Sequence, residues 1–181
     1  MLDDKLLIWK LRRANVEALR QLYDKYKVDL LRLAIILTGN VCDAEDVVQD
    51  VFLRLIQSYH RIGIRGNLRN YLITCLVNRV RTLRRRGRDH HELLFELAIA
   101  EPNPDHGPDQ WAVLNEQMCR LGEAMTQLPP EQREAVALRF EADLGFRQIA
   151  RMQNASINTV QGRYRYGMEK LRSLLNHEVT T

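Results

Sequence analysis

The chain has 181 residues, of which 45% are hydrophobic, so it can hold one ordinary domain or two very small ones but not a large catalytic barrel. It contains only nine glycines and five prolines, and leucine, arginine, glutamate and alanine dominate, which is the composition of an all-α protein. The formal net charge of +4 is only mildly basic, so the total charge alone does not identify a partner.

The cysteines and the first residues of the chain bear on where it works. Cys42, Cys75 and Cys119 are odd in number and far apart, so neither a disulfide framework nor a zinc site is indicated. Charged residues near the N-terminus break any signal-peptide core, and no apolar run approaches the length of a membrane span. We therefore expect a cytoplasmic protein with no metal, no cofactor and no membrane insertion.

Three helices are predicted in the first half of the chain, because apolar residues recur there at spacings of three and four. The first helix spans about 15–38 and ends at a glycine. The second helix begins near Asp43, which can cap it, and has an apolar stripe that includes Ile56 on one side. The third helix begins at Leu68, after a loop over 58–67 that holds two glycines.

A linker is predicted between two helical domains. Residues 101–108 include three prolines and one glycine, which cannot continue a helix. We therefore divide the chain into a first domain over 1–88, a linker over 89–110 and a second domain over 111–181. Six arginines fall within residues 79–88, and an acidic segment follows them, so the end of the first domain is expected to present a basic face to a polyanion.

A helix-turn-helix is predicted near the C-terminus. A short helix with apolar positions at Phe146 and Ile149 ends at Gln153, and a turn of suitable length follows. Ser156 is a good N-cap for the second helix. That helix has an apolar seam on one side and a polar, basic surface without an acid before Glu169 on the other. The predicted seam residues are Ile157, Val160, Tyr164, Met168, Leu171 and Leu175.

The polar side of this second helix suits the major groove of DNA. Its amides, hydroxyls and guanidinium groups can contact base edges or phosphates, and Gly162 allows close approach to the DNA backbone. The candidate DNA-binding residues are Ser156, Asn158, Thr159, Gln161, Gly162, Arg163 and Arg165. The alternative is a basic, solvent-exposed helix of a small bundle.

A second candidate interface lies on the helix that begins near Asp43. Its outer face consists of Asp46, Gln49, Asp50, Leu53 and Gln57, with the leucine at the centre of a polar ring. An apolar anchor with an acidic rim is typical of a small protein-binding hot spot. The alternative is a solvated face with one exposed leucine.

Two parts of the chain carry a family resemblance. The first is the run DAEDVVQDVFLRL over 43–55, together with NRVRTLRRR over 78–86. The second is LPPEQREAVALRF over 128–140, followed by FRQIARMQNASINTVQGRYRYGMEKLR over 146–172. In these runs the chain resembles the extracytoplasmic-function (ECF) class of bacterial RNA polymerase sigma factors. These proteins have two helical domains, called sigma-2 and sigma-4, joined by a flexible linker.

The resemblance implies a dissociable specificity subunit of RNA polymerase, with core polymerase and promoter DNA as partners and an anti-sigma factor as a potential third. The face around Leu53 would bind the clamp helices of the polymerase, and the helix-turn-helix would bind the minus-35 element. The first domain would melt the minus-10 element and hold a flipped base. The minus-10 candidates are Tyr59, His60, Arg65, Asn67, Asn78, Arg79, Arg81, Arg84, Arg85 and Arg86.

Two other functions stay open at this point. One is a stand-alone helix-turn-helix regulator whose N-terminal domain senses a signal or dimerises. The other is a small metal-dependent nuclease that uses Glu45, Asp46 and Asp50, although no histidine or glycine-rich phosphate loop accompanies these acids. On the sigma-factor hypothesis the chain has no catalytic residue and is not an enzyme.

Overall fold

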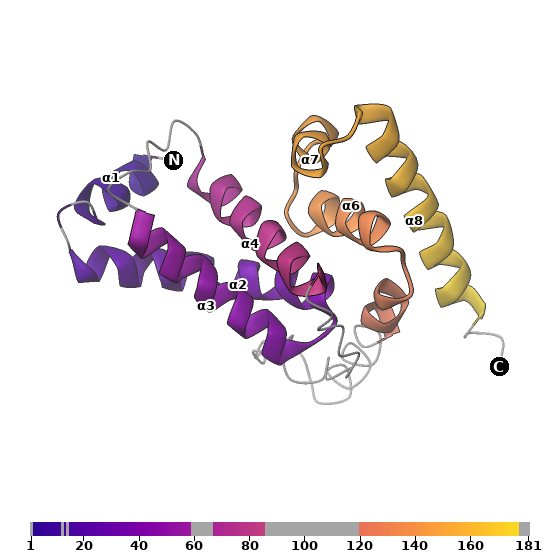
Figure 1. The fold of residues 1–181 in the computed structure, drawn as a ribbon, viewed down its shortest axis with the longest axis horizontal. Helices are drawn as coiled ribbons and strands as arrows, with labels where there is room; N and C mark the ends of the chain where they lie inside the picture. The colour runs from indigo at the N-terminus through magenta and orange to yellow at the C-terminus, as the bar shows by residue number, and fades with distance from the viewer. Residues whose placement is uncertain (1, 12, 14, 59–66, 86–119, 178–181) are drawn as a thin grey trace, which may run out of the picture.

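The computed structural model describes residues 2–11, 13, 15–58, 67–85 and 120–177. Within these ranges the regular structure is α-helical, as the composition predicts, and it forms two groups of helices that lie side by side (Figure 1). We call helices α1–α4 the N-terminal bundle, and residues 120–177, which include α6–α8, the C-terminal bundle. None of the helices in the described ranges is long and apolar enough to cross a lipid bilayer.

The N-terminal bundle is built around α2. Its helices are α1 (Leu2–Leu11), α2 (Val16–Thr38), α3 (Val41–Ser58) and α4 (Leu68–Arg85). Helix α2 packs against each of the other three, and α3 also packs against α4. Helices α2, α3 and α4 confirm the periodicity in the sequence, whereas α1 was not predicted.

The ends of α2 are capped by side-chain and backbone groups. The Oδ1 atom of Asn15 accepts a hydrogen bond from the backbone N–H of Ala18 at 3.1 Å. At the other end Gly39 adopts φ 75°, a left-handed conformation that favours glycine, and its N–H donates to the Ile35 carbonyl at 2.7 Å.

The start of α3 differs from the prediction. The helix begins at Val41, and its cap is Asn40, whose Oδ1 accepts a hydrogen bond from the Asp43 N–H at 3.0 Å. Asp43 therefore lies in the first turn, where its negative charge interacts favourably with the helix dipole. The apolar stripe also ends earlier than expected, because Ile56 is 36% exposed.

The C-terminal bundle consists of helical residues 120–126, α6 (Pro130–Phe140), α7 (Phe146–Gln153) and α8 (Ile157–His177). Helix α8 packs along α6 and α7. Val160 and Leu171 of the predicted seam are buried, but Ile157 is 39% exposed because it stands at the first position of the helix, so its place in the seam was wrong.

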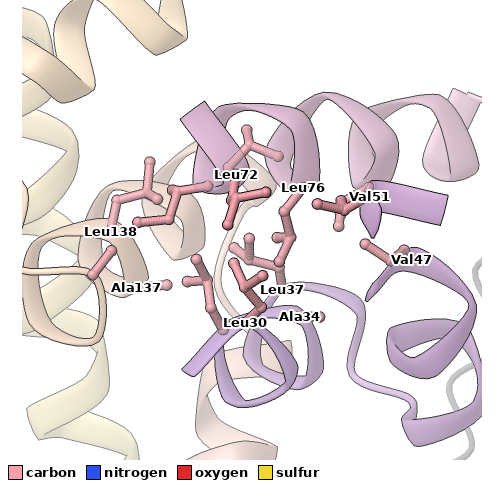
Figure 2. Packing of buried hydrophobic residues seen from close by; sticks show 14 of the residues in the cluster. Leu30, Ala34, Leu37, Val47, Val51, Leu72, Leu76, Ala137 and Leu138 are labelled. Atoms are coloured by element: carbon pink, nitrogen blue, oxygen red, sulfur yellow. The ribbon is translucent and has the colours of Figure 1, made fainter. Parts of the chain in front are cut away.

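The buried residues of the two bundles form one continuous cluster. Figure 2 shows Leu72 and Leu76 of α4 near Leu30 and Leu37 of α2, with Leu138 of α6 to their left. Helix α2 packs against α6, and this contact brings the two bundles together. The hydrophobic core therefore continues from α3 through α2 and α4 into α6. This shared core sets the position of the candidate interface on α3 relative to the one on α8.

Candidate nucleic-acid interface

The turn of the helix-turn-helix is closed by backbone and side-chain hydrogen bonds. Asn154 adopts a left-handed conformation with φ 48°, which asparagine tolerates better than most residues, and the Ala155 N–H donates to the Ala150 carbonyl at 3.0 Å. Ser156 then caps α8, because its Oγ accepts a hydrogen bond from the Thr159 N–H at 3.0 Å. The predicted N-cap is confirmed.

The candidate minus-35 residues share the outer surface of α8. Ser156, Asn158 and Thr159 are exposed at the start of the helix, whose first turn has no acid. The N-terminus of a helix has backbone N–H groups without partners in the helix and carries the positive end of the helix dipole. The start of α8 therefore attracts anions such as phosphates. Gln161 and Arg165 are exposed farther along, whereas Gly162 and Arg163 are half-buried.

Arg163 is held in place by a short hydrogen-bond chain. Its Nη1 donates to Oε1 of Gln153 at 2.7 Å, and Nε2 of Gln153 donates to the Glu131 carbonyl at 3.0 Å. Gln153 therefore connects α8 to the start of α6. Sequence analysis missed this supporting residue, because nothing in the helix pattern relates a side chain at the end of α7 to one in α8.

The two glycines of α8 have different surroundings. A Cβ atom added to Gly162 would lie 4.0 Å from Cε2 of Tyr166, its nearest neighbour outside the helix backbone. A Cβ atom on Gly167 would lie 2.9 Å from Cγ2 of Val136, which is closer than real Cβ atoms come. Gly167 thus allows α8 to pack on α6, whereas a methyl group at position 162 would meet no close neighbour among the described residues.

The face of α3 borders an apolar groove. Asp46 and Gln49 are exposed, Asp50 is half-buried, and Leu53 is 52% exposed. Leu53 and Gln49 line a groove of about 400 Å³ between α2 and α3. The other lining residues are Val16, Leu19, Arg20, Tyr23, Phe52 and Ile56. The wheel of α3 alone could not reveal this groove, because α2 supplies half of its wall.

The described minus-10 candidates are all on or next to α4, but most of its arginines already have partners within the protein. Arg79 forms an ion pair with Asp50 of α3, with 2.5 Å between Nε and Oδ2. Arg84 donates to the Leu37 carbonyl at 2.6 Å, and Arg81 contacts the C-terminal bundle.

The remaining minus-10 candidates are amides, one arginine and residues outside the described ranges. Asn67, Asn78 and Arg85 are exposed, and Oδ1 of Asn67 accepts a hydrogen bond from the Arg69 N–H at 2.9 Å. The candidates outside the described residues are Tyr59, His60, Arg65 and Arg86.

The three acids that a nuclease would use do not form a metal site among the described residues. Asp50 pairs with Arg79, while Glu45 and Asp46 are exposed. Across the part of the chain that the structure describes, no group of three or more histidine, cysteine, aspartate or glutamate side chains is placed to hold a metal ion.

Comparison with known families matches both halves of the chain. Residues 22–90 match the Sigma-70 region 2 family, and residues 120–171 match Sigma-70, region 4. The region 2 match favours a sigma factor over a stand-alone helix-turn-helix regulator, because it accounts for the helices that a regulator would use for sensing or dimerisation.

Similar proteins agree with these matches. The ECF RNA polymerase sigma factor SigE of Mycolicibacterium smegmatis is 33% identical over 162 residues, which are 88% of this chain and 60% of SigE. SigL of Mycobacterium tuberculosis is 30% identical over 167 residues, which are 90% of this chain and 91% of SigL.

A solved structure shares the fold. Bartonella quintana RpoE, solved with the anti-sigma factor NepR, superposes with a TM-score of 0.65 at 23% identity and covers 87% of this chain and 98% of RpoE. With both regions present in order and SigL 30% identical over 90% of this chain and 91% of its own length, the chain belongs to the ECF class of RNA polymerase sigma factors, which direct core polymerase to promoters.

Proposed function

We propose that three surfaces divide the work of promoter recognition in this sigma factor. The first is the α3 face of Asp46, Gln49, Asp50 and Leu53, which binds core polymerase. The second is α4 with Asn67, which binds the minus-10 element, and the third is the outer surface of α8, which binds the minus-35 element. The boundaries 1–88, 89–110 and 111–181 for the two domains and their linker belong to the same proposal.

The observation that carries this proposal is the helix-turn-helix, in which side chains on the outer surface of α8 are held in place by hydrogen bonds. Ser156 caps α8 at an end without acids, and Gln153 fixes Arg163 beside it. Such an arrangement aims backbone N–H groups and a guanidinium group at one groove of DNA, where the guanidinium can contact a guanine edge or a phosphate.

The α3 face supports polymerase binding for a separate reason. Leu53 is exposed next to an apolar groove, while Asp46 and Gln49 provide a polar edge. A partner helix with an apolar side chain could fill the groove, and basic residues on that partner could pair with the acid. This chemistry fits the clamp helices of the polymerase, which the family resemblance names as the partner.

On this proposal the chain has no catalysis of its own. Sigma factors are transcription initiation factors, and the polymerase forms the phosphodiester bonds. We place the chain in the cytoplasm, where its polymerase and promoters are.

Co-elution and footprinting test the assignment of surfaces. Wild-type chain is expected to elute with core polymerase on gel filtration and to protect two separated promoter segments from nuclease. Leu53→Ala should reduce co-elution, whereas Arg163→Ala should lose only the upstream protected segment. If both variants affected both properties equally, the division of labour would be wrong.

We also propose that an anti-sigma factor binds this chain, as NepR binds the similar RpoE. A cleft of about 510 Å³ lies between the bundles, and its lining includes Ile36, Met125 and Phe140. Phe140 is 63% exposed, and its ring stacks on that of Tyr164 with 6.1 Å between the ring centroids, so one side of the ring is open to a partner. Phe140→Ser should then abolish binding of a co-purifying inhibitor while the chain still supports transcription, and retention of that inhibitor would contradict this site.

A further inference from the structure

The outer side of α1 carries two large apolar side chains that the fold leaves exposed. Leu7, Ile8 and Leu11 of this helix belong to the buried core, whereas Leu6 is 50% exposed and Trp9 is 49% exposed. Tryptophan is among the residue types most enriched where proteins bind their partners, because its ring offers a large contact area. The packing of α1 on α2 does not use this ring.

A basic neighbour holds Trp9 at the surface. The guanidinium carbon of Arg13 lies over the indole ring, 3.8 Å from the ring centroid. The N–H of Arg13 donates to the Lys10 carbonyl at 3.0 Å, so the chain makes one further turn after α1 and brings the arginine back over the ring. A stacked guanidinium group orients an aromatic ring without removing it from water.

The chain around Trp9 is basic. Residues 5–13 include four lysines and arginines and no acid. Asp4 precedes this segment, but its Oδ1 pairs with Nζ of Lys25 at 2.7 Å and its Oδ2 accepts a hydrogen bond from Tyr26 at 2.7 Å. The charge of this acid is therefore offset within the protein, and the segment attracts anions.

Helix α1 lies at the end of the N-terminal bundle where α4 begins (Figure 1). Tyr26, which donates to Asp4 of α1, lines a small cavity together with Arg69 of α4. Trp9 follows Asp4 by five residues, which is about 8 Å along the helix axis. Asn67, a proposed minus-10 contact, caps the N–H of Arg69. The outer side of α1 and the proposed minus-10 surface are therefore neighbours.

We propose that the outer side of α1, centred on Trp9 and Arg13, is a second contact for single-stranded promoter DNA. The indole stacks on an unpaired base, while Arg13 and Lys10 contact the adjoining phosphates. Because every base has a π face, this contact holds the melted strand without reading its sequence. The proposal rests on the proposed minus-10 role of α4, which places melted DNA beside α1 and favours DNA over a protein or a lipid surface as the partner.

The test uses the full chain without polymerase, because Leu6, Trp9 and Arg13 are exposed in it. Trp111→Phe leaves Trp9 as the only tryptophan, so the indole fluorescence of this variant reports on α1 alone. A single-stranded oligonucleotide of mixed sequence should quench this emission, because a stacked base contacts the ring. The corresponding duplex should quench it less at equal concentration, since its bases are already stacked on one another.

Variants measure how much the contact contributes to affinity. Trp9→Ala should weaken binding of a labelled oligonucleotide, followed by fluorescence anisotropy, about fivefold or more. Trp9→Phe should retain most of the affinity, because a phenyl ring also stacks on bases. Arg13→Gln should reduce the slope of log affinity against log salt by about 0.7, the value for one phosphate contact on a single strand. Val28→Ala and Arg32→Gln, at exposed positions of α2, are the matched controls and should match the wild type.

Circular dichroism shows whether each variant is folded, and Trp9→Phe together with Arg13→Gln serves if Trp9→Ala folds poorly. Emission from Trp9 that does not respond to the oligonucleotide would overturn the proposal, and so would equal affinities of folded Trp9→Ala and the wild type. An unchanged salt slope in Arg13→Gln would remove the phosphate contact.

Two other partners would give different results, and either result would also overturn the proposal. A blue shift of the Trp9 emission with phosphatidylglycerol vesicles, without a response to the oligonucleotide, would assign the outer side of α1 to a lipid surface. Reduced co-elution of Trp9→Ala with core polymerase, with unchanged DNA binding, would assign it to polymerase.

Variants of α4 distinguish failure of this proposal from failure of the proposed function. Asn78→Ala and Arg85→Gln alter exposed minus-10 candidates without touching α1. If they leave the affinity for the oligonucleotide unchanged while Trp9→Ala lowers it, α1 binds the single strand and the proposed role of α4 fails. If they lower the affinity and Trp9→Ala does not, the role of α4 stands and the contact by α1 is wrong.

Discussion

Asp50 of α3 and Arg79 of α4 form an ion pair with 2.5 Å between the carboxylate Oδ2 and the guanidinium Nε. Their side chains are 36% and 17% exposed, so the pair is partly shielded from water. It joins the helix proposed to bind polymerase to the helix proposed to bind the minus-10 element. A polymerase that contacts Asp50 therefore touches a residue that also fixes the position of α4.

The first prediction concerns the strength of this ion pair. In a double-mutant cycle of Asp50→Ala and Arg79→Ala, the free energies of unfolding should be non-additive by about 1 kcal/mol, because the residues are in direct contact and partly buried. Urea denaturation of the wild type, both single variants and the double variant measures the coupling. Additive effects would show that the pair does not connect the two helices energetically.

The second prediction concerns polymerase binding by α3. Leu53→Ala should weaken binding to core polymerase by about 1–2 kcal/mol, because an apolar anchor beside a groove loses its buried area. Val28→Ala is the control, since Val28 is 48% exposed but does not line the groove. Surface plasmon resonance with immobilised core enzyme measures both, and equal affinities for the two variants would count against the α3 face.

The third prediction concerns Arg163 and its support. Arg163→Ala should reduce affinity for minus-35 DNA by roughly 1–3 kcal/mol if the side chain makes a bidentate base contact. Gln153→Ala should lose part of that energy, since Arg163 keeps its charge but not its orientation. Arg172→Ala, an exposed arginine farther along α8, is the control for charge. A gel shift at fixed salt that Arg163→Ala leaves unaltered would refute the contact.

The fourth prediction uses the two glycines of α8. Gly167→Ala should destabilise the chain by about 1 kcal/mol, because strain against the stiff Val136 side chain outweighs the gain in helix propensity. Gly162→Ala should stabilise it by up to about 1 kcal/mol, because the new methyl group meets no close neighbour. Thermal unfolding measures both signs, and stabilisation by Gly167→Ala would contradict the packing of α8 on α6.

The fifth prediction concerns pH and the attachment of α1. Burial raises the pKa of Asp4, but hydrogen bonds from Lys25 and Tyr26 outweigh it and hold that pKa below its usual 3.8. A lowered pKa in the folded state stabilises the protein above about pH 4, and this contribution disappears as the pH falls through the folded-state value.

Asp4→Asn should therefore lower the free energy of unfolding at about pH 6, with a smaller difference from the wild type at about pH 3. Denaturant titrations at the two pH values supply the comparison. A difference that does not shrink in acid would mean that the ionised carboxylate is not what attaches α1 to α2.

Local signals in the sequence were sufficient for most of the helices. The spacing of apolar residues predicted α2, α3 and α4, and the serine at position 156 predicted the start of α8. Helix α1 was not predicted, because its apolar residues do not form a single stripe. Leu7, Ile8 and Leu11 are buried, but Leu6 is 50% exposed. Asn40 and Asp43 are three residues apart, and both residue types are good N-caps. The sequence pattern does not distinguish them, so Asp43 was predicted as the cap of α3 although Asn40 has that role.

The contacts between helices could not be predicted in the same way. The candidate residues of α8 share one face because a single helix fixes their directions. Arg81 and Glu134 are 53 residues apart, and only the packing of α6 on the N-terminal bundle brings them together. The groove beside Leu53 also depends on packing between helices, because α2 supplies part of its wall.

Reconstituted transcription tests the central claim most directly. Core polymerase with this chain, supplied with fragmented genomic DNA, should produce transcripts whose sequenced 5′ ends lie downstream of a common pair of promoter elements. Core polymerase alone should not produce these ends, and Leu53→Ala should reduce their number. Transcripts that start at random positions with or without the chain would contradict the assignment of this protein as a promoter-selecting sigma factor.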